Sequence, residues 1–315
     1  MWERPTDRWL RVAPPLAALA YPALVWTGPA LWPPLLFLAL ISPAIALRSS
    51  MQLGSHAPST ARAIALFAVA GPALFSFLGG LLDFQRALPL SSVGVWIPLW
   101  LVLAALAWRA PRPTAEPPSS CPPPGRLAKA HGVVALPIVA FALAHLVNHV
   151  SGIAGGEVHL ALMHALRSVY RHRLLEPVLL GCVLTQSLTG LVLVARRLSR
   201  CASPLETLQS AAGVYLAIFF ASHLRAVLRA RGRGVDTNWH WLIDSDVFHD
   251  PWGARLAPYY VLAILALAVH LACAVRVVAM GHGARPRSWT WLIAASIGLA
   301  AMAAALVMIG LARGG

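Results

Sequence analysis

The stretch VVALPIVAFALAHLVNHVSGI, from Val133 to Ile153, decides the fold. It is about as long as the ~20 apolar residues that cross a bilayer as one helix. A second run, PYYVLAILALAVHLACAV from Pro258 to Val275, is of the same kind. Over the whole chain 58% of residues are hydrophobic and 11% are charged, whereas a soluble domain carries roughly 25% charged residues. The sequence therefore predicts an all-α, polytopic membrane helix bundle.

The chain before residue 111 contains four apolar stretches, at about 12–28, 31–47, 62–82 and 91–108. The first two are short and rich in proline, which removes a backbone donor and bends a helix. We therefore expect about four N-terminal transmembrane helices within residues 1–110, beginning with a tight hairpin of kinked helices. The following residues, 111–129, are predicted to be a linker, because the prolines between Pro111 and Gly125 favour an extended, solvated chain.

Five more apolar segments follow, at about 130–154, 174–195, 207–228, 257–280 and 289–312. Each is long enough to cross a bilayer. Ser203 is a plausible N-cap and Pro204 suits the first position of a helix, so the connection before the third of these segments is predicted to be a sharp turn. Residues 130–315 thus form a second unit, a five-helix bundle.

The positive charge of the chain is formally +14 and comes from arginine, since Lys129 is the only lysine. The arginines lie at the ends of the apolar stretches, which indicates membrane-flanking anchors and a lipid partner rather than a nucleic-acid surface. In the first half they gather on one side, which places the N-terminus and the linker in the cytoplasm. No cleavable signal peptide is visible. We expect an integral protein of a bacterial inner membrane.

Cysteine spacing limits the cofactors. The four cysteines form no CxxC or CxxCH motif. These spacings are the usual ones for thiolate iron–sulfur clusters and for covalently attached c-type haem. Neither cofactor is therefore expected.

Histidines inside the apolar segments are the candidate functional residues, because polar side chains are costly in hydrocarbon. His145 lies about 22 Å and His223 about 24 Å from the same membrane face, at 1.5 Å per helical residue. Two imidazoles at one depth on different helices suit the two axial positions of a b-type haem iron. Gly190 and Gly213 would allow a macrocycle to approach. The propionates of the haem would need cationic partners, for which Arg225, Arg167, Arg171 and Arg173 are available.

Other histidines have weaker cases. His270 lies inside a segment, but a membrane histidine can simply form a hydrogen bond between helices, and this reading is also open for the pair His145 and His223. We expect His149, one turn after His145, to line the site rather than to bind iron. Four more lie near segment ends or in a connection, where solvated histidines are ordinary: His131, His159, His164 and His172.

The second unit resembles the five-helix, dihaem cytochrome b anchor of succinate dehydrogenase and fumarate reductase. The resemblance rests on Ala144 to Asn148, Gln186 to Gly190, Gly213 to His223 and Pro258 to His270. It implies a membrane electron-transfer protein, with haem b and a quinone, whose chemistry requires soluble redox subunits. This chain itself has no flavin-binding GxGxxG motif after a strand, and no catalytic residue is assigned.

In those anchors four helices each supply one histidine, and the first helix pairs with the third and the second with the fourth. By position, the first pair is His145 and His223. The second pair is Gln186 and His270, which lie at matching depth, about 18 and 20 Å from the other face. Glutamine is a poor haem ligand, so the resemblance implies one haem rather than two.

The same unit also resembles a fungal mitochondrial outer-membrane family that recruits a lipid-transfer protein. Here the similar pieces are His145 to His149, Arg167 to Pro177 and Gly234 to Asn238. This resemblance implies an alternative function, a non-enzymatic adapter or lipid-handling protein that keeps the bundle without redox chemistry. A weaker third hypothesis is a metal-dependent hydrolase that uses His145, His149, His159, His164 and the base Glu157.

Overall fold

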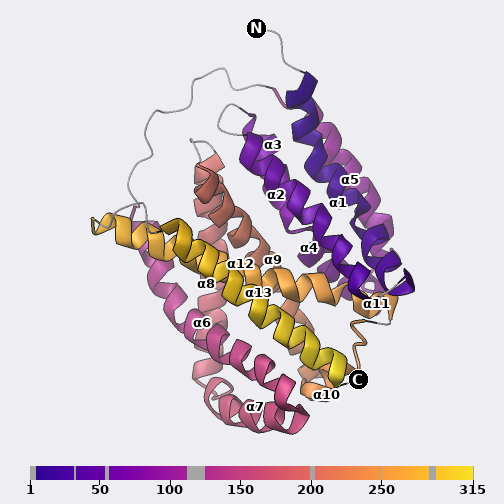
Figure 1. The fold of residues 1–315 in the computed structure, drawn as a ribbon, viewed down its shortest axis with the longest axis vertical. Helices are drawn as coiled ribbons and strands as arrows, with labels where there is room; N and C mark the ends of the chain where they lie inside the picture. The colour runs from indigo at the N-terminus through magenta and orange to yellow at the C-terminus, as the bar shows by residue number, and fades with distance from the viewer. Residues whose placement is uncertain are drawn as a thin grey trace.

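The structure, a computed structural model, describes residues 5–31, 33–53, 57–111, 125–198, 203–248, 250–283 and 289–314. Within these residues the chain forms helices and no strand, which confirms the predicted all-α fold (Figure 1). Most of the expected linker, residues 112–124, lies outside the described residues.

The N-terminal helices are longer and more broken than the sequence indicates. Helix α1 (Pro5–Leu31) is followed by the 3-10 helix η1 (Pro33–Leu40), α2 (Ile41–Leu53), α3 (Ser59–Val69), α4 (Gly71–Leu78), the π-helix η2 (Gly79–Phe84) and α5 (Ser92–Arg109). Helix α1 begins seven residues before the predicted stretch. It continues through Pro14, Pro15 and Pro22, which pack in the interior rather than ending the helix.

The second unit contains the five predicted long helices and several short ones. The long helices are α6 (Arg126–Ser151), α8 (Leu175–Leu198), α9 (Pro204–Gly232), α12 (Leu256–Gly281) and α13 (Trp289–Arg313). Between α6 and α8 lie η3 (Gly152–Ala154) and α7 (Gly156–Tyr170), and between α9 and α12 lie α10 (Trp239–Ile243) and α11 (Pro251–Ala254). At the start of α9, Ser203 and Glu206 form a reciprocal capping box, which confirms the predicted cap.

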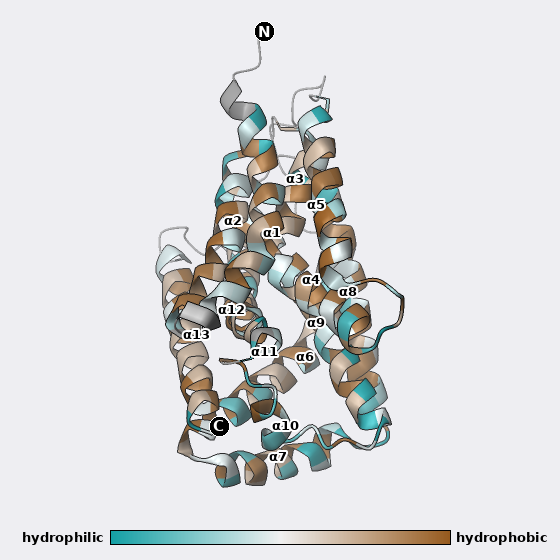
Figure 2. Ribbon diagram, turned by 90° about the vertical axis from the view of Figure 1, so that its right-hand side faces the viewer, coloured by the Kyte–Doolittle hydropathy of each residue, from teal (hydrophilic) through white to brown (hydrophobic). Residues whose placement is uncertain are grey.

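Seven helices in the described part of the chain are long and apolar enough to cross a membrane. The segment α3 to η2 would add an eighth span, but it bends by 67°. The bend falls at Gly71 and Pro72, where proline lacks the N–H that would continue the helix. Figure 2 shows apolar residues along the length of the long helices, and polar residues gathered in α7 and α10 at one end. We call the end that contains α7 and α10 the α7 end. The long apolar helices show that the protein is an integral membrane protein.

The two units share one core. Tyr21, Phe75 and Trp96 from the N-terminal helices belong to the same buried cluster as Ala211 and Met308 from the bundle. The indole N–H of Trp96 donates to the carbonyl oxygen of Ala18 at 2.9 Å. These contacts pack α1, α4 and α5 on one another and place α4 against α9.

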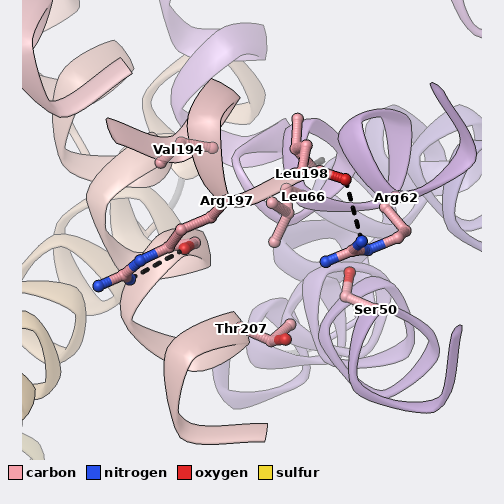
Figure 3. Close-up of a pocket in the computed structure, with 8 residues that line it drawn as sticks. Ser50, Arg62, Leu66, Val194, Arg197, Leu198 and Thr207 are labelled. Carbon is pink, nitrogen blue, oxygen red and sulfur yellow. Dashed lines mark hydrogen bonds between the residues drawn. The ribbon is translucent and has the colours of Figure 1, made fainter. Parts of the chain in front are cut away.

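A small pocket lies where α2 and α3 meet the turn between α8 and α9 (Figure 3). Arg62 reaches across it and donates to the carbonyl oxygen of Leu198 at 3.0 Å. The guanidinium of Arg197 turns away toward α9, where it contacts Gln209 at 3.0 Å and Ser210 at 3.4 Å. The two arginines therefore tie helix ends together and do not converge on one point.

Candidate functional site

Four histidines from three helices meet near the α7 end, and we call them the His145 cluster: His145 and His149 on α6, His159 on α7 and His223 on α9. The rings of His145 and His223 lie 6.1 Å apart between centroids. The Nε2 atoms of His145 and His149 are 3.2 Å apart, one donating to the other. The ring of His149 lies 5.3 Å from that of His159. The predicted pair is thus side by side, and His149 contacts it.

A phenylalanine ring stacks on each imidazole of the His145 and His223 pair. Phe141 stacks on His145 at 5.3 Å and 17°, and Phe219 stacks on His223 at 5.3 Å and 11°. Each phenylalanine precedes its histidine by four residues, a spacing that places side chains on one face of a helix. Each imidazole is therefore oriented by its own helix.

A second group lies farther from the α7 end, and we call it the His131 cluster: His131 on α6, Gln186 and Thr189 on α8 and His270 on α12. The rings of His131 and His270 are 6.3 Å apart between centroids. Gln186 and His270, which the sequence places at one depth, belong to this cluster together. The ring opposite His270 is that of His131, whose position near a segment end predicts an ordinary solvated histidine.

Hydrogen bonds assign the proton of both rings in the His131 cluster. Nδ1 of His131 donates to the hydroxyl of Thr189 at 2.9 Å, and this hydroxyl donates to the carbonyl of Thr185. Nε2 of His131 accepts from the amide of Gln186 at 2.9 Å. Nδ1 of His270 donates to the carbonyl oxygen of Gln209 at 3.1 Å. Both Nε2 atoms therefore carry lone pairs, which is the form in which imidazole binds a metal.

The two glycines expected near a macrocycle lie against this second pair. A Cβ atom at Gly190 would come within 3.2 Å of Cε1 of His131, and one at Gly213 within 3.1 Å of Cε1 of His270. A methyl group at either position would make the imidazole shift by a few tenths of an ångström. The structure thus places both glycines in the His131 cluster and not beside His145 and His223.

The four paired imidazoles and Gln186 are partly accessible although they face neighbouring helices. His131, His145, His223, His270 and Gln186 are all half-buried. Helices α6 and α8 are the least buried of the candidate spans, with 6% of their apolar window buried against 22–39% in the others. Helices α6 and α8 therefore lie at the outside of the bundle, with most of their apolar surface turned toward the bilayer.

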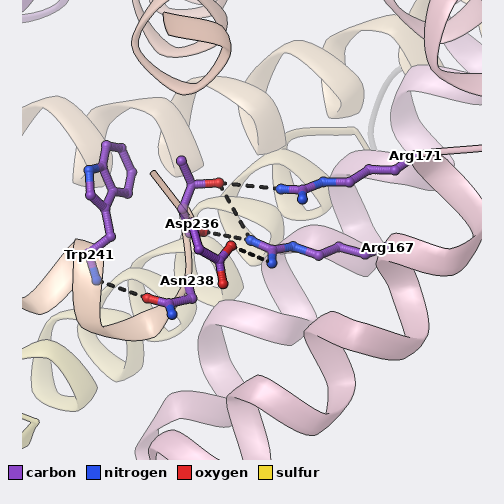
Figure 4. A network of polar contacts seen from close by, with 6 residues as sticks. Arg167, Arg171, Asp236, Asn238 and Trp241 are labelled. Atoms are coloured by element: carbon purple, nitrogen blue, oxygen red, sulfur yellow. Dashed lines mark hydrogen bonds and ion pairs between the residues drawn. The ribbon is translucent and has the colours of Figure 1, made fainter. Parts of the chain in front are cut away.

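The predicted cationic partners lie elsewhere. Arg225 bonds to Gln85 of the N-terminal unit and lies 5.6 Å from the ring of Phe77. Arg171 bonds to the hydroxyl of Thr237 at 3.4 Å (Figure 4). Burial and the neighbouring Arg167 lower the pKa of Arg171. Both arginines thus fix loops at the surface of the bundle.

His159 is buried below the surface of α7, and its Nε2 accepts from the amide of Asn148 at 3.1 Å. Desolvation, with a smaller contribution from Arg167, lowers the pKa of His159 to about 4. The imidazole is therefore neutral at pH 7. His164, the fourth member of the suggested hydrolase site, is exposed on α7. In the described ranges no three His, Cys, Asp or Glu side chains are placed to hold a metal ion, so the hydrolase hypothesis gains no support.

Compared with known proteins, the chain matches no family profile, no curated protein and no solved structure. Its class is therefore defined by the fold and the buried histidines: a polytopic α-helical membrane protein with two histidine clusters in its second unit.

Proposed function

We propose that this chain is an integral membrane b-type haem protein, with His145 and His223 as the axial ligands of one haem and His131 and His270 as those of a second. The observation that carries the proposal is the spacing of the rings, 6.1 and 6.3 Å between centroids. An imidazole nitrogen binds a metal at about 2 Å, so two opposed ligands have ring centroids roughly 6 Å apart. The spacing of both pairs agrees with this value.

The placement of the pairs also supports the proposal. His131 precedes His145 by fourteen residues, which is close to four helical turns, so the two lie on one face of α6 about 21 Å apart. Their partners come from two other helices, α9 and α12. Each pair therefore spans a gap between helices, and one helix supplies a ligand to both.

The protein's own residues would orient the ligands. Thr189 and the carbonyl of Gln209 hold the Nδ1 protons of His131 and His270, which would leave Nε2 as the nitrogen that holds a haem. Phe141 and Phe219 hold the other two rings by stacking. Gln186 and His149 contact the nitrogens of His131 and His145 and must turn aside when these bind iron. A bound haem would supply one-electron chemistry to this scaffold.

The finer assignments rest on the resemblance and on the arginine counts. We propose that electrons pass between soluble redox subunits and a quinone, and that the N-terminus faces the cytoplasm of a bacterial inner membrane. The absence of flavin and iron–sulfur motifs from the sequence supports a need for other subunits. Tryptic accessibility of the N-terminus in sealed inverted vesicles would test the orientation; protection there would contradict it.

The optical spectrum of the purified full-length protein from haem-replete cells tests the function. We expect a low-spin, bis-histidine b-type spectrum that sharpens on reduction with dithionite. His223→Ala should lose the contribution of the His145 and His223 pair, whereas His164→Ala, which changes an exposed histidine of α7, should leave the spectrum unchanged. A folded but colourless protein would contradict the proposal and would favour the adapter alternative.

A further inference from the structure

A single indole covers the end of the His145 cluster. Trp239, the first residue of α10, is 2% exposed, and its ring centroid lies 4.6 Å from that of His159. Behind it the Nδ1 atoms of His159 and His149 are both buried without a hydrogen-bond partner. Buried polar atoms without a partner are uncommon in native proteins, and bound water often supplies the missing bond. The indole therefore separates the α7 end from two nitrogens that are open to a small polar molecule.

Glycines form the seat of this indole. A Cβ atom at Gly152 would clash with Cη2 of Trp239, and one at Gly156 would lie 2.9 Å from its Cδ1. On the other side, Gly314 and Gly310 of the C-terminal segment lie against the same ring, with Cβ positions 3.0 Å and 3.5 Å from it. An added methyl group at Gly152 or Gly156 would therefore displace the ring from its place.

The segment that carries Trp239 is held by a polar clamp. Arg167 on α7 donates to the carboxylate of Asp236 at 2.7 Å and to the carbonyl of Thr237 at 2.9 Å, and Arg171 reaches the same threonine (Figure 4). Asn238 then caps α10 through the backbone N–H of Trp241 at 3.1 Å. The segment begins at Gly234, whose φ of +77° favours glycine. The clamp thus fixes Asp236 and Thr237, the two residues directly before Asn238.

We propose that Trp239 is a plug that closes a port between the aqueous phase at the α7 end and the His145 cluster, and that the Arg167 clamp keeps it closed. The port would admit water and small hydrogen-bonding molecules to the Nδ1 atoms of His159 and His149. Access would require the Trp239 segment to swing out, with Gly234 as its hinge. This inference concerns access only and does not depend on whether haem is bound.

Modification of histidine by diethyl pyrocarbonate, read residue by residue by mass spectrometry, tests the plug in membranes. His164 on the same helix is exposed and is the internal reference. In the unmodified protein we expect His159 to react much more slowly than His164. Trp239→Ala should raise the rate at His159 about tenfold or more, because burial and not the intrinsic reactivity protects it, whereas Trp239→Phe should keep most of the protection.

Two further variants test the seat and the clamp without removing the indole. Gly152→Ala takes the space of the ring, and Arg167→Gln removes the clamp; both should raise the rate at His159 while the rate at His164 stays constant. Arg173→Gln, an exposed arginine just beyond α7, is the matched control and should change neither rate. The proposal is overturned if His159 reacts as fast as His164 in the unmodified protein. It is also overturned if His159 stays protected in folded Gly152→Ala and Arg167→Gln.

Discussion

The two histidine clusters share nearly the same spacing between paired rings, 6.1 and 6.3 Å, but hold these rings in different ways. In the His131 cluster, hydrogen bonds from α8 and α9 fix both rings, and two glycines make room for them. In the His145 cluster, stacked phenylalanines fix the rings and two more histidines extend toward the α7 end. The same ring spacing therefore does not require the same supporting contacts. One pair depends on polar contacts between helices, and the other depends on packing within each helix.

The largest expected effect is the loss of haem when one histidine of a single pair is replaced. His270→Ala should remove the haem of the His131 pair and leave that of the His145 pair, because only His131 would remain to hold the first of these. The haem content of the purified protein should fall to about half. A pyridine haemochrome assay on His270→Ala and His223→Ala measures this. If either variant alone removed all haem from a folded protein, the two sites would not be independent.

The His145 cluster should make stability depend on pH through His159. Its pKa is about 4 in the folded protein, against 6.5 as the ordinary value. The folded state therefore resists protonation that the unfolded state accepts, so stability is full above pH 6.5 and falls as pH drops toward 4. The loss should be on the order of 2 kcal/mol.

Thermal unfolding of the detergent-solubilised protein between pH 7.5 and 4.5 measures this dependence. His159→Phe should weaken it, because phenylalanine fills the site and binds no proton. His164→Phe, on the exposed face of α7, should keep it. An unchanged pH dependence in folded His159→Phe would assign the effect to other groups.

The close contact at Gly190 should matter for the packing of the His131 cluster. Gly190→Ala places a methyl group 3.2 Å from Cε1 of His131, and we expect a loss of about 1–2 kcal/mol in stability from the tight contact. Gly181→Ala on the same helix meets no atom within 4 Å, so it should stabilise the helix by up to about 1 kcal/mol. Urea titration of both variants checks the sign. Equal effects would show that no close contact exists at Gly190.

The smallest expected effect concerns the stacked rings. Phe219→Leu keeps an apolar side chain but removes the stack on His223, which should cost about 1 kcal/mol and broaden the spectrum of the haem bound by the His145 pair. The spectrum of the other haem should not change. Low-temperature optical spectra resolve the two contributions, and broadening of both would contradict separate support for the two pairs.

The fold followed from the apolar segments, because a bilayer imposes a length on each helix. The start of α1 was missed because Arg8 and Arg11 shorten its apolar stretch, and because prolines within a helix look like breaks in a sequence. The bend between α3 and α4 could have been expected from Gly71 and Pro72. Helix α7 was missed because it lies along the end of the bundle and has no span-like composition.

The histidine site was predictable in part. The depth of His145 and His223 along their helices predicted their approach, which the structure shows. His131 was set aside because it lies near the start of α6, yet its separation of fourteen residues from His145 placed it on the same face. The neighbours of Gly190, Gly213 and Arg225 depend on the rotation of each helix in the bundle, which the sequence alone does not determine.

The amount of haem b bound per polypeptide in the purified, unmodified protein tests the central claim most directly. Two equally spaced histidine pairs, at 6.1 and 6.3 Å between ring centroids, predict two low-spin haems per chain. A content of one haem per chain would support one histidine pair as a haem site and exclude the other. A folded protein from haem-replete cells that contains no haem would contradict the account.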